Sequence, residues 1–269
     1  MIIDSHAHFV PPSLLAEIAD TAADFPALEL VKHDNGFGFS FAGGKPSRPV
    51  NPSLSDVAGR LNWMDQNQID HQVVGGWLDM FGYQIPVEEG IIWSKMINRH
   101  LKTFSDKSNS RFLSLATLPM QDGKGAAMVL DDAHKQGFKG VMIGTQPKGV
   151  GGVLDDPSLT PFWESADKNR SILFIHPMFD SGDPRVEDYG MNNAVGRITD
   201  TIIAISRIIY SGHVERYRNA RVVIGMGGAG LPYIIGRLSH NFKLHEETLC
   251  DPKLALSSMY YDTVIHDPS

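Results

Sequence analysis

The chain has 269 residues, of which 42% are hydrophobic and 20% charged, so it can bury a sizeable core and extensive disorder is not expected. The formal net charge is -7, which argues against nucleic acid or an anionic membrane as a partner. The single cysteine excludes an intrachain disulfide, and the first residues lack the basic and apolar regions of a signal peptide. We therefore expect a cytoplasmic protein.

Short apolar segments alternate along the chain with longer segments of helical period, which predicts an α/β fold built from βαβ units. Most of the short segments are continuously apolar, a pattern typical of parallel strands buried on both faces. The expected strands are Ile2–Phe9, Gln72–Leu78, Arg111–Leu118, Gly140–Gly144, Ser171–His176, Arg221–Gly225 and Met259–Val264.

Apolar residues three or four apart predict helices between these strands. Leu54, Val57, Leu61 and Met64 mark the first of them, with Ser53 available as its N-cap. Further helices are expected around Ile92–Leu101 and at Ala126–Gln136, Pro161–Lys168, Thr199–Ser211 and Pro232–Phe242.

Residues 28–48 interrupt this rhythm. Glycines there accompany alternating phenylalanines at Phe37, Phe39 and Phe41, which indicates a hairpin inserted after an early helix. No linker or repeat divides the rest, so residues 1–269 are predicted to form one domain, and a length near 250 residues suits an α/β barrel.

The most specific local pattern is Asp4-Ser5-His6-Ala7-His8, at the end of the first expected strand. Residues i and i+2 of a strand point to the same side, so His6 and His8 can converge on one metal ion. His176 ends another expected strand and would supply a third nitrogen. Three histidines favour Zn²⁺, with Mn²⁺ as an alternative. A chance pair and a core histidine are the competing interpretations.

Two further features have both a functional and a plain interpretation. The glycines in Gly225–Gly230 follow a strand, but they match neither a phosphate-binding loop nor a dinucleotide site, so close packing of strand and helix is the better explanation. Arg48 and Arg237 would clamp a substrate carboxylate if they face the pocket, and otherwise are surface charges.

In combination, these motifs resemble those of the amidohydrolase-related metal-dependent decarboxylases, the family of 2-amino-3-carboxymuconate-6-semialdehyde decarboxylase. The resemblance extends over nearly the whole chain and implies a distorted TIM-like (β/α)8 barrel with a small inserted β element. It is carried by residues 3–8, 47–50, 80–83, 174–177, 192–197 and 227–237.

The resemblance also implies roles for individual residues. His6, His8 and His176 would be metal ligands, and Arg48 would hold the carboxylate of a small carboxylic acid substrate. Arg237 corresponds to an arginine that reaches the neighbouring subunit's site, which implies a homodimer.

The chain departs from the family pattern at two places. Met226 stands where the family has its acid/base histidine, and a thioether cannot carry a proton at neutral pH. The family's last strand carries an aspartate ligand in a Gly-Ser-Asp-Tyr-Pro segment that this sequence lacks, and neither Asp262 nor Asp267 lies in such a motif. We therefore expect the natural chain to continue past Ser269.

Three functions are compatible with these residues. The leading hypothesis is a metal-dependent decarboxylase acting on a small unsaturated or aromatic carboxylic acid. The alternatives are a metal-dependent hydrolase or hydratase on the same scaffold and a catalytically impaired homologue, and Met226 is the reason for both. His240 and His245 could take over acid/base work, although surface positions on a helix are the simpler expectation.

Overall fold

The computed structural model describes residues 1–264. Seven of its strands run parallel to one another, and their spatial order follows their order along the chain. They form two hydrogen-bonded groups, one of three and one of four strands, joined by a bridge between Ala116 and Val141. The strands are β1 (Ile3–Phe9), β4 (His71–Gly76), β5 (Phe112–Ser114), β6 (Gly140–Gly144), β7 (Ile172–His176), β8 (Arg221–Ile224) and β9 (Tyr260–Tyr261).

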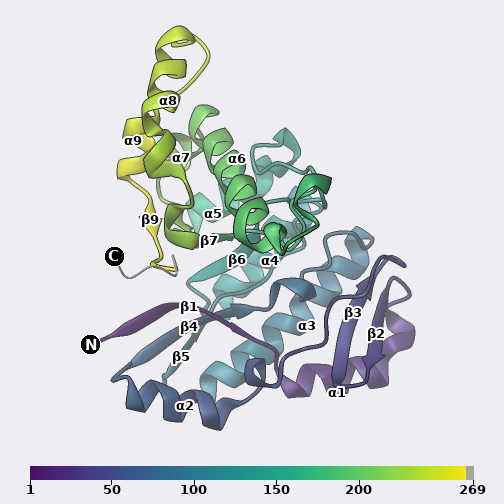
Figure 1. Ribbon diagram of the computed structural model, residues 1–269. Coiled ribbons are helices and arrows are strands. Elements are labelled where there is room, and N and C mark those ends of the chain that lie inside the picture. Colours follow the sequence, from purple (N-terminus) through teal and green to yellow (C-terminus); the bar gives the residue numbers. More distant parts are fainter. Residues whose placement is uncertain (265–269) are drawn as a thin grey trace.

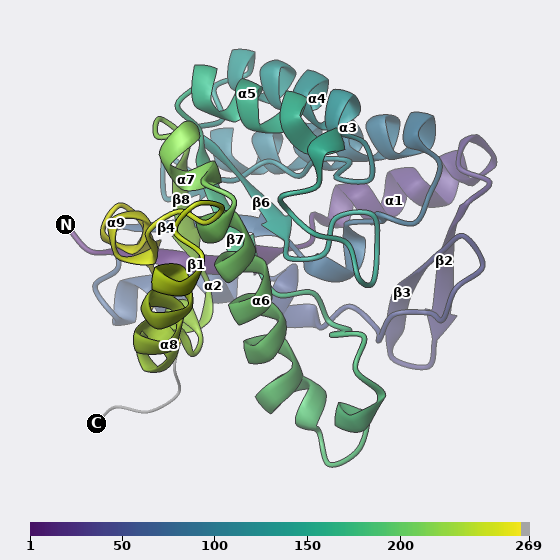
Figure 2. The same ribbon diagram turned by 90° about the horizontal axis from the view of Figure 1, so that it is seen from above.

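Helices connect the strands and cover them, as Figures 1 and 2 show. This arrangement of helices between parallel strands confirms the expected α/β fold. The helices are α1 (Pro12–Thr21), α2 (Val57–Gln66), α3 (Val87–Asp106), α4 (Gly123–Lys135), α5 (Thr160–Lys168), α6 (Arg197–Tyr210), α7 (His213–Arg216), α8 (Leu231–Leu244) and α9 (Pro252–Ser257).

The predicted hairpin is present as β2 (Leu28–His33) and β3 (Gly36–Phe41), which pair antiparallel and stand to one side of the other strands (Figure 1). Phe39 is buried and lies near Trp77 and Trp93, so the hairpin packs its apolar side onto the core. The segment after β3 carries Arg48 from the hairpin back towards the parallel strands.

Several predicted boundaries were wrong. The first expected helix begins at Val57 rather than near Leu54, and its N-cap is Asp56, whose side chain accepts a hydrogen bond from the Gly59 amide. Ser53 lies instead in a short 3-10 helix before it. A carboxylate at the N-cap also favours the positive end of the helix dipole, which the apolar spacing alone does not reveal.

The expected strands at 111–118 and 259–264 were too long, because the paired registers end at Ser114 and at Tyr261. Helix α9 was not predicted; Asp251 caps it and Pro252 occupies its first position. None of the helices in residues 1–264 is long and apolar enough to span a bilayer.

Candidate functional site

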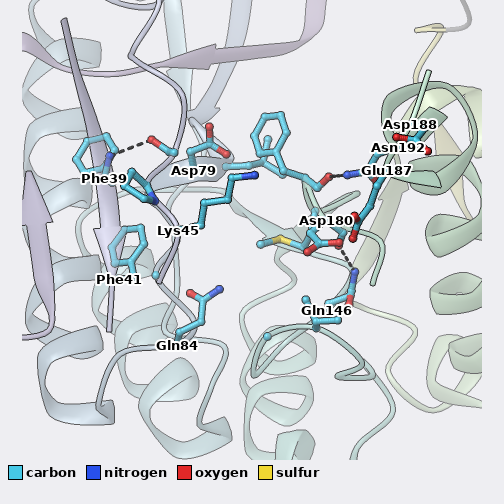
Figure 3. Close-up of a pocket in the computed structure, with 18 residues that line it drawn as sticks. Phe39, Phe41, Lys45, Asp79, Gln84, Gln146, Asp180, Glu187, Asp188 and Asn192 are labelled. Atoms are coloured by element: carbon cyan, nitrogen blue, oxygen red, sulfur yellow. Dashed lines mark hydrogen bonds between the residues drawn. The ribbon is translucent and has the colours of Figure 1, made fainter. Parts of the chain in front are cut away.

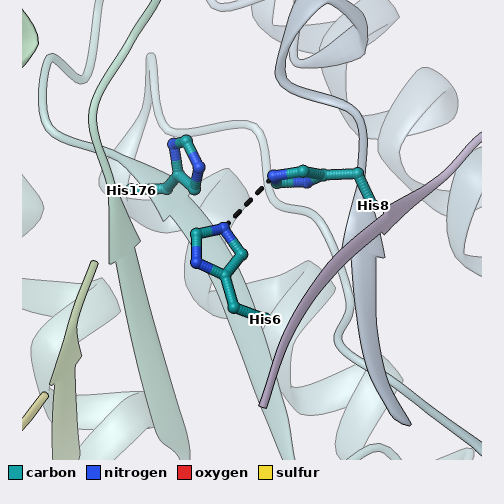
Figure 4. Close-up of side chains that lie close together, drawn as sticks. All are labelled: His6, His8 and His176. Atoms are coloured by element: carbon teal, nitrogen blue, oxygen red, sulfur yellow. Dashed lines mark hydrogen bonds between the residues drawn. The ribbon is translucent and has the colours of Figure 1, made fainter. Parts of the chain in front are cut away.

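Three histidines, from two strands that are far apart in the sequence, lie close together at one end of the parallel strands (Figure 4). His6 and His8 come from β1, and His176 is the last residue of β7. One ring nitrogen from each lies within 4.8 Å of the others, and the ring centroids are 4.9–5.2 Å apart. The structure therefore brings together the three residues that the sequence singled out.

Each of these rings has its Nδ1 atom beside an oxygen acceptor. His6 Nδ1 is 2.6 Å from Asp262 Oδ2, His8 Nδ1 is 3.3 Å from the Gly76 carbonyl, and His176 Nδ1 is 2.8 Å from the Pro177 carbonyl. A proton on every Nδ1 satisfies all three acceptors and leaves every Nε2 with a free lone pair. The Nε2 atoms of His6 and His8 are 3.3 Å apart.

The surroundings also keep two of the rings uncharged. Burial, reinforced by the neighbouring His6, lowers the pKa of His8 to about 3. Burial and the other two histidines lower the pKa of His176 well below its usual value. Neutral imidazoles are the form that binds a metal, so this donor set fits a divalent cation such as Zn²⁺.

Asp262 lies one residue after β9, the last parallel strand, and contacts His6 on β1, the first. Its side chain is 1% exposed, it accepts the His6 hydrogen bond, and its other oxygen accepts the Gly227 amide at 2.7 Å. Burial opposes ionisation, but the hydrogen bonds from His6 and Gly227 outweigh it and lower the pKa of Asp262. Asp262 therefore fixes the orientation of His6, a position that its sequence context did not disclose. Asp267 lies outside the described residues.

A cavity of about 740 Å³ lies between the β2–β3 hairpin and the segments that follow β4, β6 and β7 (Figure 3). Leu78 and Asp79, which follow β4, and Met178 and Phe179, which follow β7, form part of its lining. The last residue of β4, Gly76, accepts a hydrogen bond from His8, and the last residue of β7 is His176. Aromatic and polar side chains both contribute to the wall, among them Phe39, Phe41, Lys45, Asp79, Gln84, Gln146, Phe179, Asp180, Glu187, Asp188 and Asn192.

Arg48 lies at this wall with a second arginine. Its Cζ is 4.3 Å from the centroid of the Phe179 ring and 5.5 Å from that of Trp77, and its Nε is 3.5 Å from Asp79 Oδ2. Arg197, the first residue of α6, also stands 4.3 Å over Phe179. Two guanidinium groups share one ring beside a single carboxylate, so this part of the wall can bind an anionic ligand, while Asp180, Glu187 and Asp188 line other parts of the cavity.

Arg237 does not join this group. It is exposed on α8 and lines a separate surface depression with Tyr210, Ile234, Leu238, His240 and Asn241. His240 and His245 are exposed as well, as expected for surface histidines.

Met226 follows β8 and begins a short 3-10 helix, with a backbone φ of 58°. The glycines after it are tightly packed. A Cβ on Gly228 would lie 2.7 Å from the Tyr261 ring, and one on Gly230 would lie 2.6 Å from Ile202 of α6. These close approaches favour the packing interpretation of the glycine segment.

Asp79 was not predicted from the sequence, and Arg197 was predicted only as part of the segment 192–197, without a role of its own. Asp79 comes three residues after β4, a position where parallel strands place site residues, and this was a usable signal. Arg197 begins a strongly apolar helix, and nothing in the sequence joins it to Arg48 or Phe179. Their proximity is a consequence of the tertiary fold.

Comparisons with known proteins add an independent finding. A family model described as Amidohydrolase matches residues 3–248. The 2-amino-3-carboxymuconate-6-semialdehyde decarboxylase of Dictyostelium discoideum is 29% identical over 231 residues, which is 83% of this chain and 64% of that protein. The chain thus spans slightly less than two thirds of this relative.

Solved structures share the fold. The 5-carboxyvanillate decarboxylase of Sphingomonas paucimobilis aligns with a TM-score of 0.76 and 23% identity, over 96% of this chain and 79% of that one. The 5-carboxyvanillate decarboxylase of Novosphingobium aromaticivorans, complexed with manganese and 4-hydroxy-3-methoxy-5-nitrobenzoic acid, aligns with a TM-score of 0.72 and 21% identity, over 98% and 74%.

Proposed function

The chain belongs to the amidohydrolase family, and on this basis we propose that it is a metal-dependent decarboxylase of a small aromatic or unsaturated carboxylic acid. The observation that carries the proposal is the set of three converging histidines, each with its Nδ1 atom beside an oxygen acceptor. The names of the relatives, which are decarboxylases of such acids, support the choice of reaction.

In this proposal His6, His8 and His176 hold the ion through their Nε2 atoms. A bound divalent ion would act as a Lewis acid that polarises substrate oxygen atoms. Zn²⁺ is our first choice because the donors are three neutral imidazoles, and Mn²⁺ is the alternative because a structural neighbour was solved with manganese. Asp262 keeps the His6 ring in the orientation that binding requires.

Arg48 is the proposed carboxylate-binding residue. Its side chain is 61% exposed, yet Phe179, Trp77 and Asp79 restrain the guanidinium beside the cavity. A planar guanidinium held in this way can bind a carboxylate through two parallel hydrogen bonds and fix the orientation of the acid.

A second candidate is hydrolysis or hydration on the same scaffold, or an impaired decarboxylase. Met226 favours it, because a methionine occupies the position where the family pattern has an acid/base histidine. These alternatives predict turnover without CO₂, or no turnover even when the protein is loaded with metal.

The test uses protein reconstituted separately with Zn²⁺ and Mn²⁺ and a panel of 5-carboxyvanillate, 2,6-dihydroxybenzoate and 2-amino-3-carboxymuconate-6-semialdehyde. CO₂ release that depends on the metal supports decarboxylation. Consumption of an acid without CO₂ supports the hydrolase or hydratase, and no consumption of any acid supports the impaired homologue. His176→Ala protein is the control for catalysis by free metal.

We also propose that the parallel strands form one domain with a distorted TIM-like barrel, and that Arg237 contributes to a homodimer. The contact between β1 and the residue after β9, through His6 and Asp262, supports the barrel. The exposure of Arg237 and the 570 Å³ depression beside it support a surface available to a second copy. Light scattering of wild-type and Arg237→Ala protein tests the dimer.

A further inference from the structure

Asp79 is a carboxylate in an unusual position. It lies three residues after Gly76, whose carbonyl oxygen is 3.3 Å from His8 Nδ1. The two arginines beside it connect it to the histidines, because the charge of Arg48 lowers the pKa of His8 and that of Arg197 lowers the pKa of His176. Its side chain is only 10% exposed and lines the 740 Å³ cavity (Figure 3). A carboxylate is rarely buried to this extent unless it is fully paired or serves a function.

The pairing of Asp79 is incomplete. Arg48 Nε is 3.5 Å away, at the long end of an ion pair, and the Arg48 side chain is itself mostly exposed. Arg197 stands over the same Phe179 ring as Arg48 but makes no ion pair with Asp79, and its Nε atom has no hydrogen-bond partner within residues 1–264. The two arginines therefore retain capacity to bind another anion.

The other charged side chains that line the cavity are Lys45, on the segment after β3, and Asp180, Glu187 and Asp188, on the segment between β7 and α6. Burial is the largest influence on Asp79 and raises its pKa to about 6, while Arg48 and Arg197 act in the opposite direction. Asp79 can thus gain and lose a proton near neutral pH, which Met226 cannot do.

We propose that Asp79 is the proton donor of the reaction, in place of the acid/base histidine that Met226 replaces. This inference rests on the proposed decarboxylase function. The bond between the substrate carbon and the carboxylate carbon breaks, its electron pair stays on the substrate carbon, and the carboxylate carbon leaves as CO₂. The substrate carbon then takes the proton of the Asp79 carboxyl, and Asp79 regains a proton from water in the cavity.

Protonation of Asp79 serves substrate binding as well. An ionised Asp79 competes with the substrate for Arg48 and repels a second carboxylate in the cavity. A protonated Asp79 leaves Arg48 free to bind the substrate carboxylate and holds the proton that the product needs. One protonation event therefore prepares both recognition and the chemical step.

The experiment compares Asp79→Asn, which keeps the shape but cannot donate a carboxyl proton, with Asp79→Glu, which retains the acid. The control is Glu164→Gln, an exposed carboxylate on α5 outside the cavity. Metal content is measured for every variant, so that a loss of metal is not mistaken for a loss of the proton donor. The kcat for CO₂ release from 5-carboxyvanillate is followed from pH 4.5 to 8.5 in H₂O and in D₂O.

For the wild type, kcat should fall as pH rises above about 6, because only protonated Asp79 donates. Asp79→Asn should lose on the order of 100-fold or more in kcat, together with this pH dependence and the solvent isotope effect. Asp79→Glu should retain both. Benzoate, measured in the upper part of the range where it is fully ionised, should bind the wild type more weakly as pH rises above 6 but bind Asp79→Asn with a constant Kd.

The proposal is overturned if Asp79→Asn keeps the wild-type kcat and pH profile, even though the decarboxylase function then stands. It is also overturned if only KM changes, because Asp79 would then be a positioning residue for Arg48. A wild type that releases no CO₂ from any acid of the panel overturns the proposed function and this inference together. The three failures are therefore distinguishable.

Discussion

Replacing Asp79 by asparagine should stabilise the folded protein at neutral pH. Burial raises the pKa of Asp79 from 3.8 to about 6, so the folded state holds this proton more tightly than the unfolded state does. The contribution of Asp79 to the free energy of unfolding therefore falls as pH rises from about 4 through about 6, and stays constant above that. Asparagine carries no charge and removes this loss.

The magnitude follows from the size of the shift. Roughly two pKa units at 1.36 kcal/mol each correspond to about 3 kcal/mol, of which about 2 kcal/mol develops between pH 4 and pH 8. Asp79→Asn should thus raise the free energy of unfolding, relative to the wild type, by about 2 kcal/mol more at pH 8 than at pH 4. Differences in packing between the amide and the carboxyl are the same at both pH values and cancel.

Equilibrium urea unfolding of metal-free protein measures this difference, since metal binding to the histidines would add its own pH dependence. Glu164→Gln, exposed on α5, should show no comparable change between the two pH values. If the Asp79→Asn effect differed by less than about 0.5 kcal/mol between pH 4 and pH 8, Asp79 would titrate normally. The reasoning from burial would then be wrong, and the proton-donor proposal would lose its support.

Three further predictions concern the histidine site and the position of Met226. His176→Ala should reduce bound metal in elemental analysis from one equivalent to a small fraction, whereas the exposed His240→Ala should leave it unchanged; equal metal content would place the ion elsewhere. Asp262→Asn should weaken metal affinity by about 10- to 100-fold in a competition titration with a chelator, because His6 loses its anionic partner, and an unchanged affinity would contradict that role. Met226→His should raise kcat for CO₂ release in the wild-type background and partly restore Asp79→Asn, and no gain in either background would show that Met226 is not the missing acid/base position.

The sequence alone determined the α/β alternation and the three histidines. Continuous apolar runs such as β6 and β7 are visible without a structure, because both faces of a parallel strand are buried. The two-residue period of a strand placed His6 and His8 on one side, and the structure agrees even though β1 has an irregular register between Asp4 and Ala7. Such periodicities depend only on the spacing of residues along the chain, so they can be recognised without a structure.

Only the tertiary structure decided which residues complete the site. Asp262 is 256 positions from His6, and its carboxylate can accept the His6 hydrogen bond only because the fold brings the end of β9 close to β1. Arg48, Asp79 and Arg197 come from a hairpin segment, a strand end and a helix start, and they meet around Phe179. Charge interactions depend on distance and burial, neither of which a sequence contains, and this is why the sequence suggested Arg237 but not Arg197 or Asp79.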